Sequence, residues 1–343
     1  CRCGPPCAGL HFAHPLTTVG YPELMPLNVS LFSSPSEAPG HGLQIGCFAR
    51  DVIDGARSGC VAAVFERSGY IEVDGDWVCV ANVDAGYNAV TISVRSSSSN
   101  DWLDHFQVGA PVGITPSLLS ISNRPAVNLL PLTLWSPAVA PCWSLATLSR
   151  GLQTLAKWAP DARLPADGLG QYLYGSQAIG VATRESDAAG GAIADLTQWL
   201  RGVVDPTGES GVLARSVRTL IGLGPGLTPS GDDFLAGMLI ALSACGAKRW
   251  QHQLANAVQA GLQGTGSVSQ THLKAAMKGE GGEALHQALV ALMAGEGDRL
   301  GHAVAALDRV GHTSGWDGLA GVVTVLRAIT GRPFLVRDGH CLS

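Results

Sequence analysis

The stretch GLGPGLTPSGDDFLAGMLIAL, residues 222–242, decides the architecture of the second half of the chain. Its first eight residues include three glycines and two prolines, and these predict a tight loop because both residue types set the backbone angles of turns. The apolar run from Phe234 to Cys245 follows. It is shorter than the roughly 20 residues that span a bilayer, so it predicts a core helix. Ser230 with Asp233 three residues later is similar to a capping box, in which Asp replaces Glu or Gln, and predicts the helix start.

The same helix start occurs a second time. Residues 314–321, SGWDGLAG, share the pattern S-G-x-D-x-L-A-G with residues 230–237, and both copies continue into apolar sequence. We therefore predict two helices with a hydroxyl and a carboxylate at the positive end and a small Ala-Gly pair one turn on. If the two starts face each other, the carboxylates of Asp233 and Asp317 lie within roughly 10 Å, a span that one ion can bridge. Gly237 and Gly321 then lie at the contact between the helices.

The first copy has more than capping requires, because a glycine-rich loop precedes it and Asp232 stands beside Asp233. Loop amides and a helix N-terminus bind anions, while neighbouring carboxylates favour a hard cation such as Mg²⁺ or the N–H groups of a substrate. We predict Asp232 and Asp233 as possible Mg²⁺ ligands. The predicted catalytic residues are Asp232, Asp233, Asp317 and His312, and the predicted substrate- or phosphate-binding residues are Gly224, Gly226, Thr228, Ser230, Gly231, Ser314, Gly315, His272 and Arg124.

The two histidines are candidates for acid–base chemistry, and Arg124 is a candidate for a bidentate contact to a carboxylate. The competing interpretation is structural, since Ser and Asp cap many helices and a single histidine is commonly part of a core. The sequence has no G-x-x-x-x-G-K-[ST], G-x-S-x-G or H-E-x-x-H motif. The motifs that define P-loop nucleotide-binding proteins, α/β-hydrolase serine enzymes and zincin metalloproteases are therefore not present in this sequence.

The remaining sequence predicts an α+β protein. Residues 1–45 are expected to be an irregular N-terminal extension, residues 46–140 a β-rich domain, and residues 141–343 a helical domain that carries the site. Alternating apolar residues and the Asp74-Gly75 hairpin signal indicate strands in the first domain, where four prolines between Gly109 and Ser136 exclude a helix. Apolar residues at three- and four-residue spacing predict helices at 145–158, 193–204, 211–221, 250–262, 283–293 and 299–310.

Composition narrows the class of partner. The 343 residues are 46% hydrophobic and carry a net charge of −5, with no run of Lys or Arg. Nucleic acid and anionic membranes are therefore not expected as partners. The nine cysteines are scattered and odd in number, which favours a reducing cytoplasm over a disulfide framework. Cys1, Cys3 and Cys7 form a cluster that could bind a metal, but it has no fourth ligand nearby, so a poorly ordered end is expected instead.

With residues 224–233 (GPGLTPSGDD) and 311–317 (GHTSGWD) identified, the chain resembles the oxamate carbamoyltransferase subunit family of bacterial allantoin catabolism, formerly a domain of unknown function. The resemblance extends from about Val61 through Trp135 to Ile329. It implies a subunit of a multi-subunit carbamoyltransferase in purine degradation, with a synthetase-like partner, which phosphorolyses oxalurate to oxamate and carbamoyl phosphate. The chain has no phosphate loop like that of the aspartate-type transcarbamoylases. Two alternatives stay open: a non-catalytic scaffold subunit, and a related enzyme that processes amides or carbamoyl groups.

Overall fold

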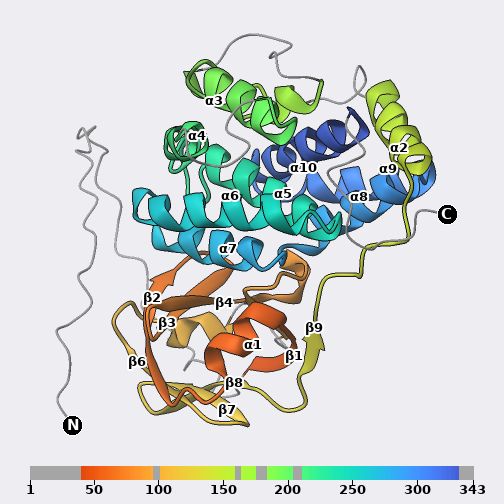
Figure 1. Cartoon of the computed structure of the whole chain (residues 1–343). Helices are drawn as coiled ribbons and strands as arrows, with labels where there is room; N and C mark the ends of the chain where they lie inside the picture. Colours follow the sequence, from red (N-terminus) through yellow and green to blue (C-terminus); the bar gives the residue numbers. More distant parts are fainter. Residues whose placement is uncertain (1–39, 96–100, 159–163, 175–183, 204–210, 332–343) are drawn as a thin grey trace, which may run out of the picture.

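The computed structural model describes residues 40–95, 101–158, 164–174, 184–203 and 211–331. A curled sheet is built from the first part of the chain, and helices follow it from residue 145 onward (Figure 1). This confirms the predicted α+β class. The expected irregular extension lies outside the described residues up to position 39, and so does the Cys1, Cys3 and Cys7 cluster.

The sheet has nine strands in the order β5-β4-β3-β2-β6-β7-β8-β1-β9, and it curls far enough for β1 to pair also with β5. Most neighbours are antiparallel, but β4–β5, β1–β8 and β1–β9 are parallel. The strands are β1 (Gly40–Gly46), β2 (Ser58–Val64), β3 (Ser68–Val73), β4 (Asp76–Asn82), β5 (Thr91–Arg95), β6 (Pro111–Ile114), β7 (Leu118–Ile121), β8 (Arg124–Asn128) and β9 (Thr133–Trp135).

The hairpin between β3 and β4 forms where Asp74-Gly75 predicts it. Val73 pairs with Asp76, and the two turn residues have φ values of 52° and 87°. Both values are positive, as the tight turns that match the twist of a hairpin require. Inward-facing side chains such as Ile71, Val80 and Ile92 are fully buried and form the core inside the curled sheet.

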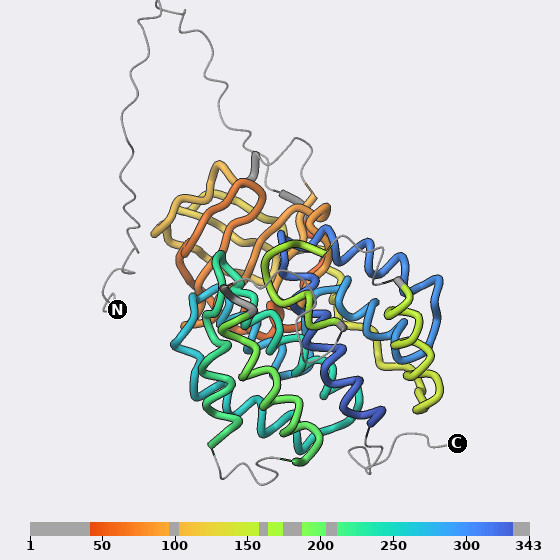
Figure 2. Tube along the Cα trace, turned by 90° about the horizontal axis from the view of Figure 1, so that it is seen from above, coloured from red at the N-terminus to blue at the C-terminus, as the bar shows by residue number. Residues whose placement is uncertain are grey.

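The helical region contains α2 (Leu145–Trp158), α3 (Arg184–Leu200), α4 (Val212–Leu220), α5 (Ser230–Ala244), α6 (Lys248–Gly261), α7 (Ser267–Met277), α8 (Glu283–Ala294), α9 (Gly297–Leu307) and α10 (Ser314–Gly331). Every helix that the apolar spacing predicts is present, with ends shifted by up to nine residues at α3. The apolar helices α5 and α10 are at the centre of a single core and are buried on nearly all sides. Helix α2 lies beside α8 and α9, which come much later in the sequence (Figure 2).

Three elements were not predicted. Strand β1 begins at Gly40, inside the stretch expected to be irregular, and the short helix α1 (Cys47–Ile53) follows it directly. Helix α7 has few large apolar residues, so its period is weak in the sequence, yet its small side chains Ser269, Ala275 and Ala276 are buried. Short 3₁₀ turns complete the structure at Val83–Ala85, Asp101–His105, Gly170–Tyr174 and Leu262–Gly264.

Helix α7 lies between the helices and the sheet (Figure 1). Two ion pairs cross this junction, from Lys274 to Asp76 on β4 and from Lys278 to Asp51 on α1. The backbone also crosses it, because Ala89 donates a hydrogen bond to Gly281 and Glu283 donates one to Tyr87. None of the described helices combines the length and the apolarity needed to cross a bilayer.

Candidate functional site

The two repeated helices pack directly against each other through their glycines. A Cβ atom added to Gly237 of α5 would lie 2.0 Å from the carbonyl oxygen of Gly318 on α10, and one added to Gly321 of α10 would lie 2.0 Å from the carbonyl oxygen of Phe234 on α5. The paired positions are equivalent in the two copies, so the contact is reciprocal, as a local twofold relation requires. The predicted place of Gly237 and Gly321 at the helix contact is confirmed.

The turns that lead into the two helices are also alike. Leu223 donates to the carbonyl of Leu220 at the end of α4, and Val310 donates to the carbonyl of Leu307 at the end of α9. The next residue in each turn, Gly224 or Gly311, has positive φ (113° and 62°). The second residues of the helices, Gly231 and Gly315, approach the carbonyls of Leu220 and Leu307 so closely that added Cβ atoms would lie 1.9 and 2.2 Å from them. These two predicted binding residues therefore have a clear packing role.

We call the first turns of α5 and α10, together with the residues just before them, the helix heads. The heads face each other. The Thr228 hydroxyl is 3.0 Å from that of Ser314, and the Ser230 hydroxyl is 3.5 Å from that of Thr313. The capping-box interpretation was wrong in detail, because the N-cap of α5 is Pro229 and no side chain caps the helix. Ser230 is the first helical residue, and its hydroxyl is directed across to the other head.

Asp233 and Asp317 occupy equivalent positions and are linked crosswise. Asp233 accepts hydrogen bonds from Ser314 and Thr228, and Asp317 accepts them from Ser230, Thr313 and the backbone at Leu169 and Gly170. Each carboxylate is thus reached by the serine of the opposite head, in agreement with the predicted convergence. In each one the Oδ2 atom is buried and has no hydrogen-bond partner among the described residues. A buried oxygen of this kind is costly unless it holds a proton, a cation or a ligand.

Burial governs the charge of this pair. It raises the pKa of Asp317 to about 6, despite the hydrogen bond of 2.6 Å that the Leu169 N–H donates to Oδ1. Burial and the charge of Asp317 together raise the pKa of Asp233 well above its usual range. Two carboxyls that interact in this way share their titration, and an N–H donor or a cation between them would stabilise their charged forms.

This electrostatic arrangement predicts a pH-dependent effect of Asp233→Asn. A carboxyl with a higher pKa in the folded state stabilises the fold while protonated, and that contribution is lost as pH rises through the folded pKa. From about pH 4 to above pH 6, the free energy of unfolding of the wild type should therefore fall relative to that of the variant. Urea unfolding of the wild type and the variant at about pH 4.5 and about pH 8 measures this difference. Asp298→Asn is the control, because Asp298 is an exposed residue at the start of a helix. A difference that does not change with pH would contradict the assignment.

Asp232 does not converge with this pair. Its Oδ1 accepts a hydrogen bond of 2.9 Å from the Gly222 N–H, and its Oδ2 accepts bonds of 2.5 Å from Thr265 and 2.7 Å from Ser269. The side chain is buried and joins the loop before α5 to α7. The predicted catalytic and metal-binding role of Asp232 is not supported, because its oxygens already have three donors within the protein.

We expect Asp232→Ala to destabilise the fold by at least about 3 kcal/mol, because it leaves three donors without their acceptor and each lost bond to a charged acceptor costs about 1.5–3 kcal/mol. Denaturant unfolding at neutral pH tests this value. The neighbouring Asp233→Asn, in which no backbone donor loses its acceptor, should cost less than 1 kcal/mol at the same pH by the same reasoning. Equal losses for the two variants would show that the carboxylates do not differ in role.

The loop between α4 and α5 supplies further hydrogen-bond donors. The backbone amides of Gly224, Gly226, Leu227 and Thr228 donate no hydrogen bond to any described residue. Gly224 and Gly226 both have positive φ, which turns the backbone at these positions, and residues 225–227 are exposed. The amides lie beside the N-terminus of α5, where the helix dipole favours negative charge.

The other predicted residues are not joined to the heads by any described contact. His312 has a side chain that is 81% exposed, with its Nε2 3.9 Å from Asp167. His272 lies on α7, where burial lowers its pKa to about 4. Arg124 is exposed at the tip of the β7–β8 hairpin, next to Ser122 and Asn123 with positive φ. This hairpin lies on the side of the sheet away from the helices, so the predicted role of Arg124 as a clamp is not supported (Figure 1).

Sequence reasoning missed the segment that holds Asp317. Gly168 has a φ of 82°, and an added Cβ would lie 2.7 Å from Oδ1 of Asp317 and 3.0 Å from Thr313. Only glycine fits there, and it lets the Leu169 N–H reach the carboxylate. The available signal was the sequence Gly168-Leu169-Gly170, which repeats the Gly-Leu-Gly at 222–224.

The donors at the heads fit a magnesium ion only in part. Asp233 and Asp317 offer one unpartnered carboxylate oxygen each, but the described residues contain no cluster of three or more His, Cys, Asp or Glu side chains suited to a metal. Mg²⁺ is commonly bound by one or two carboxylates together with substrate phosphate and water. The pair therefore fits a cation that arrives with a phosphate.

Comparison with known proteins agrees with the resemblance seen in the sequence. Residues 220–326 match the family described as oxamate carbamoyltransferase subunit AllH. The match is narrower than the expected range from Val61 to Ile329, but it includes both helix heads and almost all of the α5–α10 pair. No solved structure matches the chain.

Proposed function

We propose that this chain is a subunit of an oxamate carbamoyltransferase complex and that its two helix heads form the substrate site. The proposed reaction is the phosphorolysis of oxalurate to oxamate and carbamoyl phosphate, in allantoin breakdown, with a synthetase-like partner subunit. The proposal rests on the fact that the family match and the unpartnered carboxylate oxygens fall on the same segment of the chain. The residues that match the family are those that place two buried carboxylates, each with an unpartnered oxygen, between facing helix N-termini.

The groups at the heads suit both halves of the reaction. The amides of Gly224, Gly226, Leu227 and Thr228 and the N-terminus of α5 can hold a phosphate or the oxalyl carboxylate. The oxygens of Asp233 and Asp317 can accept hydrogen bonds from the N–H groups of the ureido end. The raised pKa values of the two carboxyl groups lessen the repulsion that an anion beside them would meet. The hydroxyls of Ser230 and Ser314 are placed to orient the group between the heads.

Magnesium, where it takes part, would be held by Asp233 and Asp317 together with phosphate oxygens. Bound in this way, the ion would neutralise phosphate charge as the carbamoyl group is transferred. The protein groups would still be needed to orient the substrate, because the hydroxyls and the loop amides reach it from other directions. Stabilisation of the purified chain against heat by Mg²⁺ with phosphate, lost in Asp233→Asn, would support this assignment independently of turnover.

A scaffold function is the second candidate, and one observation favours it. The helices approach backbone to backbone at Gly237 and Gly321, which is the geometry of a packing motif as well as of a site. In this interpretation the heads hold α5 and α10 in place for assembly, and another subunit carries out the reaction.

Release of carbamoyl phosphate from oxalurate tests the proposed function. The complex purified with all its subunits should form this product only when phosphate is present. Hydrolysis of oxalurate without phosphate would instead indicate an amide-processing enzyme. No product with all subunits present would refute the substrate assignment.

A further inference from the structure

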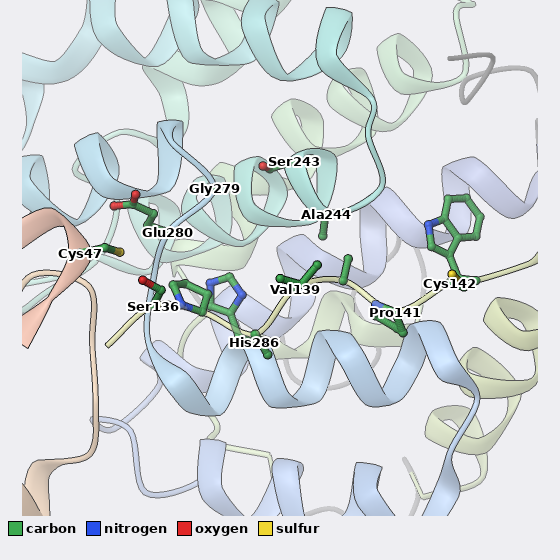
Figure 3. Close-up of a pocket in the computed structure, with 14 residues that line it drawn as sticks. Cys47, Ser136, Val139, Pro141, Cys142, Ser243, Ala244, Gly279, Glu280 and His286 are labelled. Carbon is green, nitrogen blue, oxygen red and sulfur yellow. The ribbon is translucent and has the colours of Figure 1, made fainter. Parts of the chain in front are cut away.

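A cavity lies at the end of α5 that is away from the helix heads. It has a volume of about 440 Å³ and is lined by the start of α1, the connection 136–143, the end of α5, the α7–α8 loop and α8. Ser243 lies thirteen residues after Ser230, so this cavity is about 20 Å from the helix heads at 1.5 Å of rise per residue. Figure 3 shows Glu280 and Cys47 together at one end of the cavity and Cys142 at the other.

Two buried polar atoms in this cavity, one on His286 and one on Glu280, have no hydrogen-bond partner among the described residues. His286 is 6% exposed, and its Nε2 makes no hydrogen bond. Its ring extends from α8 toward the interior of the cavity (Figure 3). Oε2 of Glu280 is likewise buried and unpartnered. Native proteins leave few such atoms, and a pair that lines one cavity points to a ligand that satisfies both.

The charge state of these groups limits what the ligand can be. Burial lowers the pKa of His286 to about 4, so the ring is neutral at pH 7. Burial also raises the pKa of Glu280. Burial, together with the charge of Glu280 and a hydrogen bond to it, raises the pKa of the Cys47 thiol to about 11. Lys278, the nearby cation, is already paired with Asp51 at 2.8 Å. An anion would be repelled by Glu280. The neutral His286 ring in its Nε2–H tautomer can donate to a carbonyl oxygen, so an amide or urea group matches both ends of the cavity.

The cavity walls are mostly apolar. The connection contributes Pro137, Val139 and Pro141, and α5 contributes Ala244. The loop that carries Glu280 is held by backbone hydrogen bonds to α7 and to the sheet. An apolar cavity with a few directed polar groups is the usual form of a small-molecule site.

We propose that this cavity binds a small neutral molecule with a primary amide or urea group on an apolar body. The NH₂ group would donate to Oε2 of Glu280, and the carbonyl oxygen would accept from Nε2 of His286. The apolar body would lie against the proline and alanine wall.

Benzamide is a suitable probe, because benzoate and benzylamine have the same ring with an anionic or a cationic head. On the full-length chain, calorimetric titration should show benzamide binding with a Kd of about 1 mM or tighter. His286→Phe and Glu280→Ala should each weaken binding at least about tenfold, while His302→Phe on exposed α9 and Asp233→Asn at the helix heads should leave it unchanged. Tighter binding of benzylamine or benzoate, or loss of benzamide binding in Asp233→Asn, would overturn the proposal.

Alkylation of the wild-type chain provides a second test that needs no variant to fold. Cys47 and Cys142 both line the cavity, but Cys142 is exposed. Bound benzamide should slow the modification of Cys47 by a maleimide several-fold relative to that of Cys142. Equal rates for Cys47 with and without saturating benzamide would also overturn the proposal. Neither test depends on oxalurate turnover, so the failure of one proposal does not decide the other.

Discussion

Gly237→Ala is expected to destabilise the chain by about 2–4 kcal/mol, the cost of overpacking a site where backbone, rather than a flexible side chain, must move. The added methyl group would lie 2.0 Å from the Gly318 carbonyl oxygen, and the equivalent Gly321→Ala meets Phe234 in the same way. The helix propensity of alanine, worth at most about 1 kcal/mol, does not offset this cost. Denaturant unfolding of each variant measures the effect.

Gly191→Ala is the matched control. Gly191 is an exposed helical glycine in α3 with nothing within 4 Å of an added Cβ. The same substitution should therefore stabilise the protein by roughly 0.5–1 kcal/mol. If Gly237→Ala is as stable as Gly191→Ala, the two repeated helices do not pack as described.

Asp233→Asn and Asp317→Asn are expected to lower kcat/KM for oxalurate phosphorolysis by about 100-fold or more, the usual effect of removing a group that interacts with the reacting atoms. Both variants should still fold and assemble with their partner subunits. In Asp317→Asn some stability is also lost, because the Leu169 N–H then donates to a neutral amide oxygen, which is a weaker acceptor than a carboxylate. Steady-state kinetics on the assembled complex, with size-exclusion chromatography for assembly, measure both properties.

Asp298→Asn serves as the control for these variants, since Asp298 is an exposed acidic residue in the first turn of α9. It should leave kcat/KM unchanged. Full activity of the assembled complex with Asp233→Asn would support the scaffold function. So would dissociation of that complex into subunits that keep full activity without this chain.

The repeated motif predicted the relation between α5 and α10 because it has a direct physical meaning. Small residues one turn into two helices allow their backbones to touch, and identical offsets make the contact reciprocal. The strands around Asp74-Gly75 were likewise predictable, since turn chemistry and alternation act locally.

Other features depend on contacts between distant parts of the chain. The pairing of β1 with β5 and β9 is not encoded in the composition of residues 40–46. Asp232 and Asp233 looked equivalent in sequence, but neighbours on a helix point about 100° apart, so one faces α7 and the other faces α10. The second copy could have indicated this, because Trp316 stands where Asp232 stands in the first.

A crystal structure of the assembled complex with oxamate and phosphate tests the central claim most directly. It should show a ligand between the two helix heads, in contact with the amides of residues 224–228 and with the carboxyl groups of Asp233 and Asp317. The account would be contradicted if the ligands were bound only to another subunit and the helix heads contacted no ligand.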